Sequence, residues 1–237
     1  MMSACKQGRR RSKLTFWKNK IGIIALIVAM ATMLAACGAP SSEKLFSSFE
    51  QAASTESAAS AAFEELKQLE ARDQKQYNTI LDKGERSNVN VQTLITQTMS
   101  SLDQRQQAMT KVKEQVTAAY EHVKQAQSQV DKLETAQGKE QAAQALTAYT
   151  KRYETVQQLA TQYEKLIASE RALYEQLKAE QTNLKQLQQA VRERNQQWTQ
   201  VDQLKQQFNQ YTEQFNTNKD AFYKAAGIQT DKANSSK

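Results

Sequence analysis

Hydrophobic residues recur every seven positions through the middle of the chain, between Gly84 and Gly138. One position of the repeat holds Ile95, Leu102, Met109, Val116, Val123 and Val130. A second position, between these, holds Thr98, Arg105, Val112, Ala119, Ala126 and Leu133. Two such positions in every seven residues predict one helix that packs along its whole length, as in a coiled coil. We expect Arg105, the charged exception, either to reach the surface or to pair with a carboxylate.

A second long pattern covers residues 139–226 in two parts. The first part includes Tyr149, Tyr153, Val156, Ala160, Tyr163 and Ile167, and the second includes Val201, Leu204, Phe208, Tyr211, Phe215 and Phe222. One helix over this range would be about 130 Å long, roughly twice the length of the preceding helix. We therefore predict a reversal near 178–184, where Glu180, Thr182 and Asn183 interrupt the pattern and can cap a new helix. The alternative is one bent helix, which gives three helices in all.

The first helical segment covers residues 42–83. Leu45 and Phe49 begin its apolar pattern, and a Ser/Ala-rich stretch at 52–62 predicts thin packing or a kink. We read Gly84, Gly138 and Gly227 as helix ends, because C-terminal caps favour a positive φ. The predicted fold is an all-α, elongated, up-and-down four-helix bundle with coiled-coil-like packing over 43–226, followed by a disordered polar tail at 227–237.

The first 36 residues have the layout of an export signal. A basic stretch precedes an apolar run from Ile21 to Met33, and Leu34, Ala35, Ala36, Cys37 and Gly38 follow it. The sequence Leu-Ala-Ala-Cys resembles the lipobox of bacterial lipoproteins. That resemblance implies cleavage before Cys37, lipid attachment to its thiol, and recognition of Leu34, Ala35, Ala36 and Gly38 by the signal peptidase. Residues 37–42 are then a lipidated cysteine with a short tether.

The alternative for this segment is an uncleaved membrane anchor. Only the 16 residues 21–36 separate Lys20 from Cys37. A spanning helix needs about 20 residues, so the length favours a cleaved signal.

Cleavage changes the interpretation of the charge. The chain carries a formal net charge of +7, but seven of its 32 basic residues and none of its 25 acidic residues lie in residues 1–36. The predicted mature chain is therefore neutral, which argues against a nucleic-acid partner. Cys5 leaves with the signal and Cys37 is acylated, so no thiol remains for a disulfide, a metal or catalysis.

Few residues of the predicted mature chain have a pattern typical of catalysis. His122 is the single histidine, and no group of acids around it has metal-ligand spacing. We therefore predict no enzyme activity, no catalytic residue, no metal and no cofactor. Tyr149, Tyr153, Tyr163 and Tyr174 follow one helix face; core packing is the favoured reading, and stacking on sugars is the alternative. Arg192, Arg194 and Trp198 are a speculative contact group for a wall polymer or a partner, with a solvated face as the alternative.

Several segments resemble the YkyA-like lipoprotein family of Gram-positive bacteria, whose members are described as cell-wall-binding. The similar segments are the lipobox at 34–38, and the residues at 44–50, 77–84, 152–154, 170–177 and 221–228. The resemblance implies an all-α bundle on the outer face of the cytoplasmic membrane, with no known enzymatic activity. It supplies no binding residues.

Two functions follow as hypotheses. The first is a non-enzymatic, membrane-anchored envelope lipoprotein that binds the cell wall, with membrane lipid, peptidoglycan or a teichoic polymer as partners. The second is a helical scaffold or regulator that binds another envelope protein.

Overall fold

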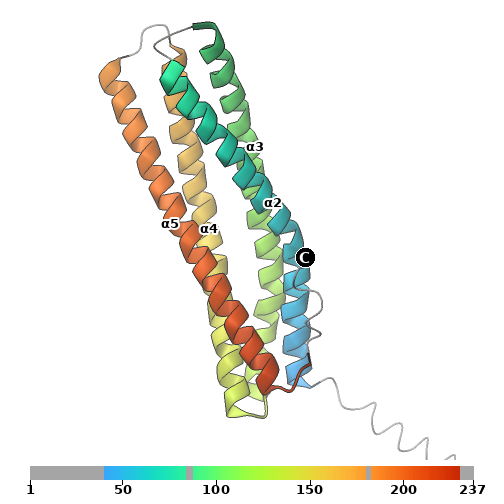
Figure 1. Cartoon of the computed structure of the whole chain (residues 1–237). Coiled ribbons are helices and arrows are strands. Elements are labelled where there is room, and N and C mark those ends of the chain that lie inside the picture. Colours follow the sequence, from blue (N-terminus) through green and yellow to red (C-terminus); the bar gives the residue numbers. More distant parts are fainter. Residues whose placement is uncertain (1–39, 84–87, 180–182, 230–237) are drawn as a thin grey trace, which may run out of the picture. The chain divides into compact units, whose positions relative to one another are not determined.

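The computed structural model describes residues 40–83, 88–179 and 183–229. These residues form four long helices, α2 (Ser41–Lys83), α3 (Asn88–Ala126), α4 (Ala136–Lys178) and α5 (Leu184–Ala225), with a short 3-10 helix, η1 (Gln127–Lys132), between α3 and α4. Successive helices run in opposite directions in an up-and-down bundle (Figure 1). The predicted fold class and the four-helix division are confirmed, and the three-helix alternative is wrong.

Several predictions concern residues outside these described ranges. The export segment, Cys37 and residues 230–237 of the predicted tail lie outside the described residues. Within the described ranges, none of the helices has the length and apolar character needed to cross a bilayer.

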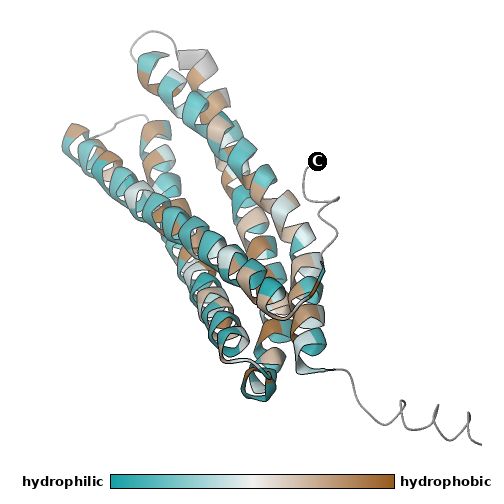
Figure 2. Cartoon of the chain, turned by 60° about the horizontal axis from the view of Figure 1, so that its bottom comes forward, coloured by the Kyte–Doolittle hydropathy of each residue, from teal (hydrophilic) through white to brown (hydrophobic). Residues whose placement is uncertain are grey.

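The heptad seam predicted for residues 95–133 is the inner face of α3. All of its members, including Thr98 and Arg105, are buried. The structure differs from the prediction only at the C-terminal end of the seam. There α3 stops at Ala126, and the last repeat continues as η1. Hydrophobic and hydrophilic residues alternate along each helix in Figure 2, as a seam with a solvated outer face requires.

The bundle consists of two helix hairpins, α2 with α3 and α4 with α5, which meet mainly through α3 and α4. The backbones of α2 and α5 approach each other less closely, and aromatic side chains make contacts across the space between them. Phe49 of α2, for example, meets Phe215 of α5 edge to face, with ring centroids 5.5 Å apart. The Ser/Ala-rich stretch packs thinly, as predicted, through buried Ala52, Ala59 and Ala62, and α2 continues through it as one helix.

Two helix ends match the sequence. Asn183 caps α5, because its side-chain oxygen accepts the backbone N–H groups of Lys185 at 2.9 Å and Gln186 at 3.3 Å. Gly227 has a φ of 67° after the last turn of α5. Its N–H donates to the carbonyl of Lys224, and the N–H of Ile228 donates to that of Tyr223, which is a Schellman ending.

The prediction that Gly138 ends a helix is wrong. Gly138 lies in the first turn of α4, where its N–H donates to the Thr135 hydroxyl at 3.0 Å. A Cβ atom at this position would lie 2.8 Å from that hydroxyl oxygen. The glycine therefore serves the N-terminal cap of α4, and Thr135 is the capping residue.

Replacement of Asn183 tests the boundary between α4 and α5. Asn183→Ala removes the acceptor for two N–H groups and should lower the free energy of unfolding by about 1 kcal/mol. The matched control is Asn216→Ala, at an exposed position inside α5, where alanine is the better helix former. Urea unfolding of the full chain in detergent, followed by circular dichroism, measures both. Equal stability of the two variants would contradict the capping role.

Candidate functional site

The carboxylate of Glu170, on α4, is the centre of a buried charge network. Arg105 of α3 donates to its Oε2 atom at 2.5 Å, and Arg194 of α5 donates to its Oε1 atom at 3.1 Å. The indole N–H of Trp198 donates to the same Oε1 atom at 2.9 Å. Glu170, Arg105 and Arg194 are all at most 4% exposed. Helices α3, α4 and α5 are therefore joined by hydrogen-bonded ion pairs away from water.

The network also reaches α2 at three points, one of which is Gln74, which accepts from Arg194 at 3.0 Å. Arg105 donates to Asp73 at 3.4 Å, and Ser101 donates to the same carboxylate oxygen at 2.8 Å. Arg105 also donates to the hydroxyl of Tyr163, which in turn donates to Glu70, each at 2.9 Å. Each of the four helices thus supplies one buried charge to this network, Asp73, Arg105, Glu170 or Arg194, and these two negative and two positive charges balance.

Burial and charge act against each other within the network. Burial raises the pKa of Asp73, although the hydroxyl of Ser101 and the guanidinium of Arg105 act in the opposite direction. Burial alone would lower the pKa of Arg105, but the adjacent Glu170 carboxylate raises it above its usual range. Burial likewise raises the pKa of Tyr163, which keeps its hydroxyl proton available for Glu70. Arg105 therefore stays charged, and Tyr163 stays a donor.

The structure separates the three residues that the sequence suggested as a contact group. Arg192 is exposed, whereas Arg194 is 4% exposed and bonded to Glu170. Trp198 is half-buried, with its N–H on Glu170. Of the four tyrosines considered for sugar stacking, Tyr149, Tyr163 and Tyr174 are buried and Tyr153 is half-buried, so the core reading is confirmed for the first three.

A groove of about 410 Å³ lies beside the network, between α2 and α5. The rings of Phe63 on α2 and Phe208 on α5 meet in it with centroids 5.2 Å apart. Lys205 of α5 donates to both oxygens of Glu70, at 2.8 and 2.6 Å, and this pair forms part of its wall. The remaining lining residues are Ser60, Glu64, Leu66, Lys67, Leu159 and Asn209.

Sequence reasoning did not single out this groove, because Glu70 and Lys205 are 135 residues apart. The buried charges carried a readable signal. Glu170 continues the heptad position of Tyr149, Val156 and Tyr163, and Arg194 lies seven residues before Val201. Seam positions of packed helices face each other, so opposite charges at such positions on different helices can be predicted to form ion pairs.

The comparisons with known proteins identify one family. The profile of YkyA, described as "putative cell-wall binding lipoprotein", matches residues 41–225. The chain belongs to this family. Searches of the curated proteins and of the solved structures gave no match.

The match to the YkyA family begins with the first residue of α2 and ends with the last residue of α5. The charge network and the groove therefore both lie inside the family region, whereas Cys37 precedes it. In the described part of the chain, no group of three or more His, Cys, Asp or Glu side chains is placed to hold a metal ion. The groove presents aromatic, amide and charged side chains to solvent.

Truncation of Glu170 tests the network. Glu170→Ala leaves the guanidinium groups of Arg105 and Arg194 without their shared carboxylate, and should lower the free energy of unfolding by about 3–5 kcal/mol. The control is Arg171→Ala, which breaks an ion pair to Asp103 whose side chains are 38% and 66% exposed. It should cost less than about 1 kcal/mol. Similar losses in the two variants, measured by urea unfolding of the full chain, would contradict the central role of Glu170.

Proposed function

We propose that this protein is a lipid-anchored, non-enzymatic envelope lipoprotein that binds cell-wall glycan in the groove between α2 and α5. The observation that carries the proposal is the aromatic pair Phe63 and Phe208 beside charged and amide side chains, in a member of a family described as cell-wall-binding. The partners are then membrane lipid, at one end of the chain, and peptidoglycan.

The anchor is supported by the lipobox at 34–38 and by the family's description as a lipoprotein. Four residues of chain lead from Cys37 to Ser41, and span at most about 14 Å when fully extended. Acylation of Cys37 would therefore hold the start of α2 close to the outer surface of the cytoplasmic membrane. Two acyl chains bury enough methylene groups for stable attachment.

The groove has the chemistry that a sugar requires. The apolar face of a pyranose ring packs on aromatic faces, which half-buried Phe63 supplies, backed by the buried ring of Phe208. Its hydroxyl and N-acetyl groups need hydrogen-bonding partners at the edge, which Glu64 and Asn209 supply. A volume of about 410 Å³ is within the usual range for small-ligand sites, which fits a short stretch of glycan.

Truncation of Phe63 tests glycan binding. Phe63→Ala removes half of the aromatic pair, and should weaken retention of the full chain on purified peptidoglycan sacculi about tenfold. The matched control is Phe46→Ala, which removes another half-buried aromatic side chain of α2, one that packs on Tyr223 away from the groove. The control should bind as the wild type does.

Two results would overturn the proposal. Wild-type protein that is retained on sacculi no better than an unrelated helical protein removes wall binding altogether. Equal losses for Phe63→Ala and Phe46→Ala remove the groove as the site.

The anchor is tested separately by mass spectrometry of the protein purified from membranes. We expect an N-terminus at Cys37 that carries a diacylglyceryl group, because the lipobox directs cleavage before the modified cysteine. Cys37→Ser should retain residues 1–36, since the thiol that must be lipidated before cleavage is absent. A wild-type protein that keeps its first 36 residues would show that the segment is an uncleaved anchor.

A further inference from the structure

Helix α4 contains the same residue pattern twice, 14 residues apart. Gln144, Thr147, Tyr149 and Lys151 recur as Gln158, Thr161, Tyr163 and Lys165. Fourteen residues correspond to nearly four helical turns and about 21 Å of helix axis. The two copies therefore lie one above the other on almost the same side of α4.

The two tyrosines of the repeat fix how α4 is rotated in the bundle. Tyr149 donates to Glu56 of α2, and Tyr163 donates to Glu70, which is also 14 residues further along. Both tyrosines are at most 1% exposed. Because the inner face is held at both copies, the glutamine, threonine and lysine of each copy are exposed on the opposite face.

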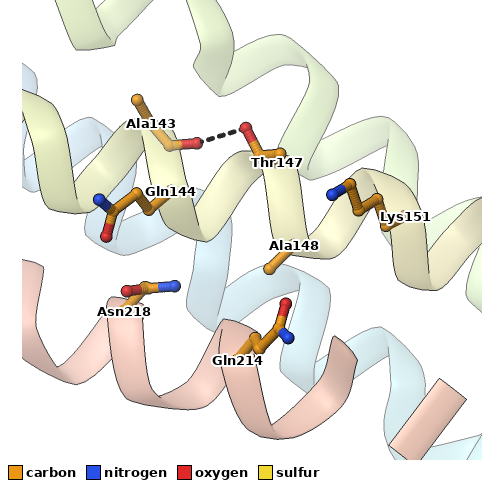
Figure 3. Close-up of a pocket in the computed structure, with 7 residues that line it drawn as sticks. All are labelled: Ala143, Gln144, Thr147, Ala148, Lys151, Gln214 and Asn218. Atoms are coloured by element: carbon orange, nitrogen blue, oxygen red, sulfur yellow. Dashed lines mark hydrogen bonds between the residues drawn. The ribbon is translucent and has the colours of Figure 1, made fainter. Parts of the chain in front are cut away.

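Each copy forms part of an open surface pocket between α4 and α5. The first pocket, of about 300 Å³, includes Gln144, Thr147 and Lys151, with Gln214 and Asn218 facing them from α5 (Figure 3). The second, of about 420 Å³, includes Gln158, Thr161 and Lys165, with Leu204 from α5. Two pockets with equivalent α4 residues thus lie at a fixed spacing.

The threonines of the two pockets are in equivalent states. Thr147 donates to the carbonyl of Ala143 at 2.8 Å, and Thr161 donates to that of Gln157 at 3.2 Å, so both hydroxyl oxygens are left to accept (Figure 3 shows the first). Within the part of the chain that the structure describes, neither Lys151 nor Lys165 forms an ion pair. Each copy therefore presents an exposed cation beside amide and hydroxyl groups, although the ammonium of Lys151 also lies 5.8 Å from the centroid of the Tyr211 ring.

We propose that this repeated face of α4 is a second wall-binding surface, on which one peptidoglycan strand occupies both pockets at once. A repeated site on a rigid helix suits a ligand whose own groups repeat along a chain. Each pocket alone is shallow and weak, but engagement of the second becomes intramolecular once the first is filled. The ammonium groups of Lys151 and Lys165 would pair with free carboxylates of the stem peptides.

The balance of groups favours peptidoglycan over a phosphate polymer. Amides and hydroxyls outnumber the single lysine in the first pocket, where Gln144, Gln214, Asn218 and Thr147 surround Lys151. Such groups bond the N-acetyl and peptide amides of peptidoglycan, whereas phosphate recognition relies on clustered cations and bidentate arginine. Glu154, exposed between the two lysines, further weakens attraction to a chain of phosphates.

This inference rests on the proposed function, and the test separates the two. Full-length protein is bound to sacculi stripped of teichoic polymers, and to single disaccharide-peptide units. On sacculi, Lys151→Ala and Lys165→Ala should each weaken binding at least about tenfold, because either change removes the two-point attachment of a strand to this face of α4. On single units, each variant should stay within about twofold of the wild type, because one intact pocket remains. Lys178→Ala, an exposed lysine of α4 outside both pockets, is the control and should have no effect.

Every other outcome is informative. Wild-type protein that fails to bind sacculi defeats the proposed function and this inference together. Wild-type binding that both lysine changes leave intact defeats this inference alone. Lysine-dependent binding to purified teichoic polymer, without binding to stripped sacculi, replaces peptidoglycan by a phosphate polymer and overturns the assignment made here.

Discussion

The bundle depends on one shared carboxylate. Glu170 accepts hydrogen bonds from Arg105 of one hairpin and Arg194 of the other, with all three side chains nearly excluded from water. Taking these charges out of water is costly, so the pairs add stability only in the register that brings them together. A slide of one helix by a single turn, about 5.4 Å, would leave buried charges unpaired. We infer that the network selects one register among the many that a heptad seam permits.

That register also positions the two surfaces that we propose bind the wall. With Glu170 fixed, Tyr163 reaches Glu70, and Glu70 holds Lys205 across the space between α2 and α5. Phe63 and Phe208 then face each other in the groove beside this pair. The same register fixes the rotation of α4 about its axis, so that Gln144 and its counterpart Gln158 face solvent. The buried network thus determines which side chains each helix presents to solvent. Helix propensity alone could not do so, because good helix formers occur throughout the chain.

Patterns of short range were readable from the sequence, and contacts of long range were not. The heptad seam of α3 was predictable because burial follows a seven-residue period, and the cap at Asn183 because it involves only the next three residues. Gly138 was misread because a glycine also serves an N-terminal cap, here that of Thr135. Arg194 was grouped with surface residues by its charge, although its heptad position matches that of Val201. The groove could not be predicted, because its residues come together only through the register between α2 and α5, and no local sequence pattern determines that register.

Photo-crosslinking in intact cells tests the central claim, that this bundle contacts the wall through defined faces. Probes replace Asn209, at the groove, and Gln158, on the repeated face, with Thr110 on the exposed side of α3 as the control. The account predicts adducts to glycan or stem-peptide fragments from the first two positions and none from the third, identified by mass spectrometry. Adducts from both positions to a single envelope protein, without wall fragments, would contradict it and make the protein a scaffold.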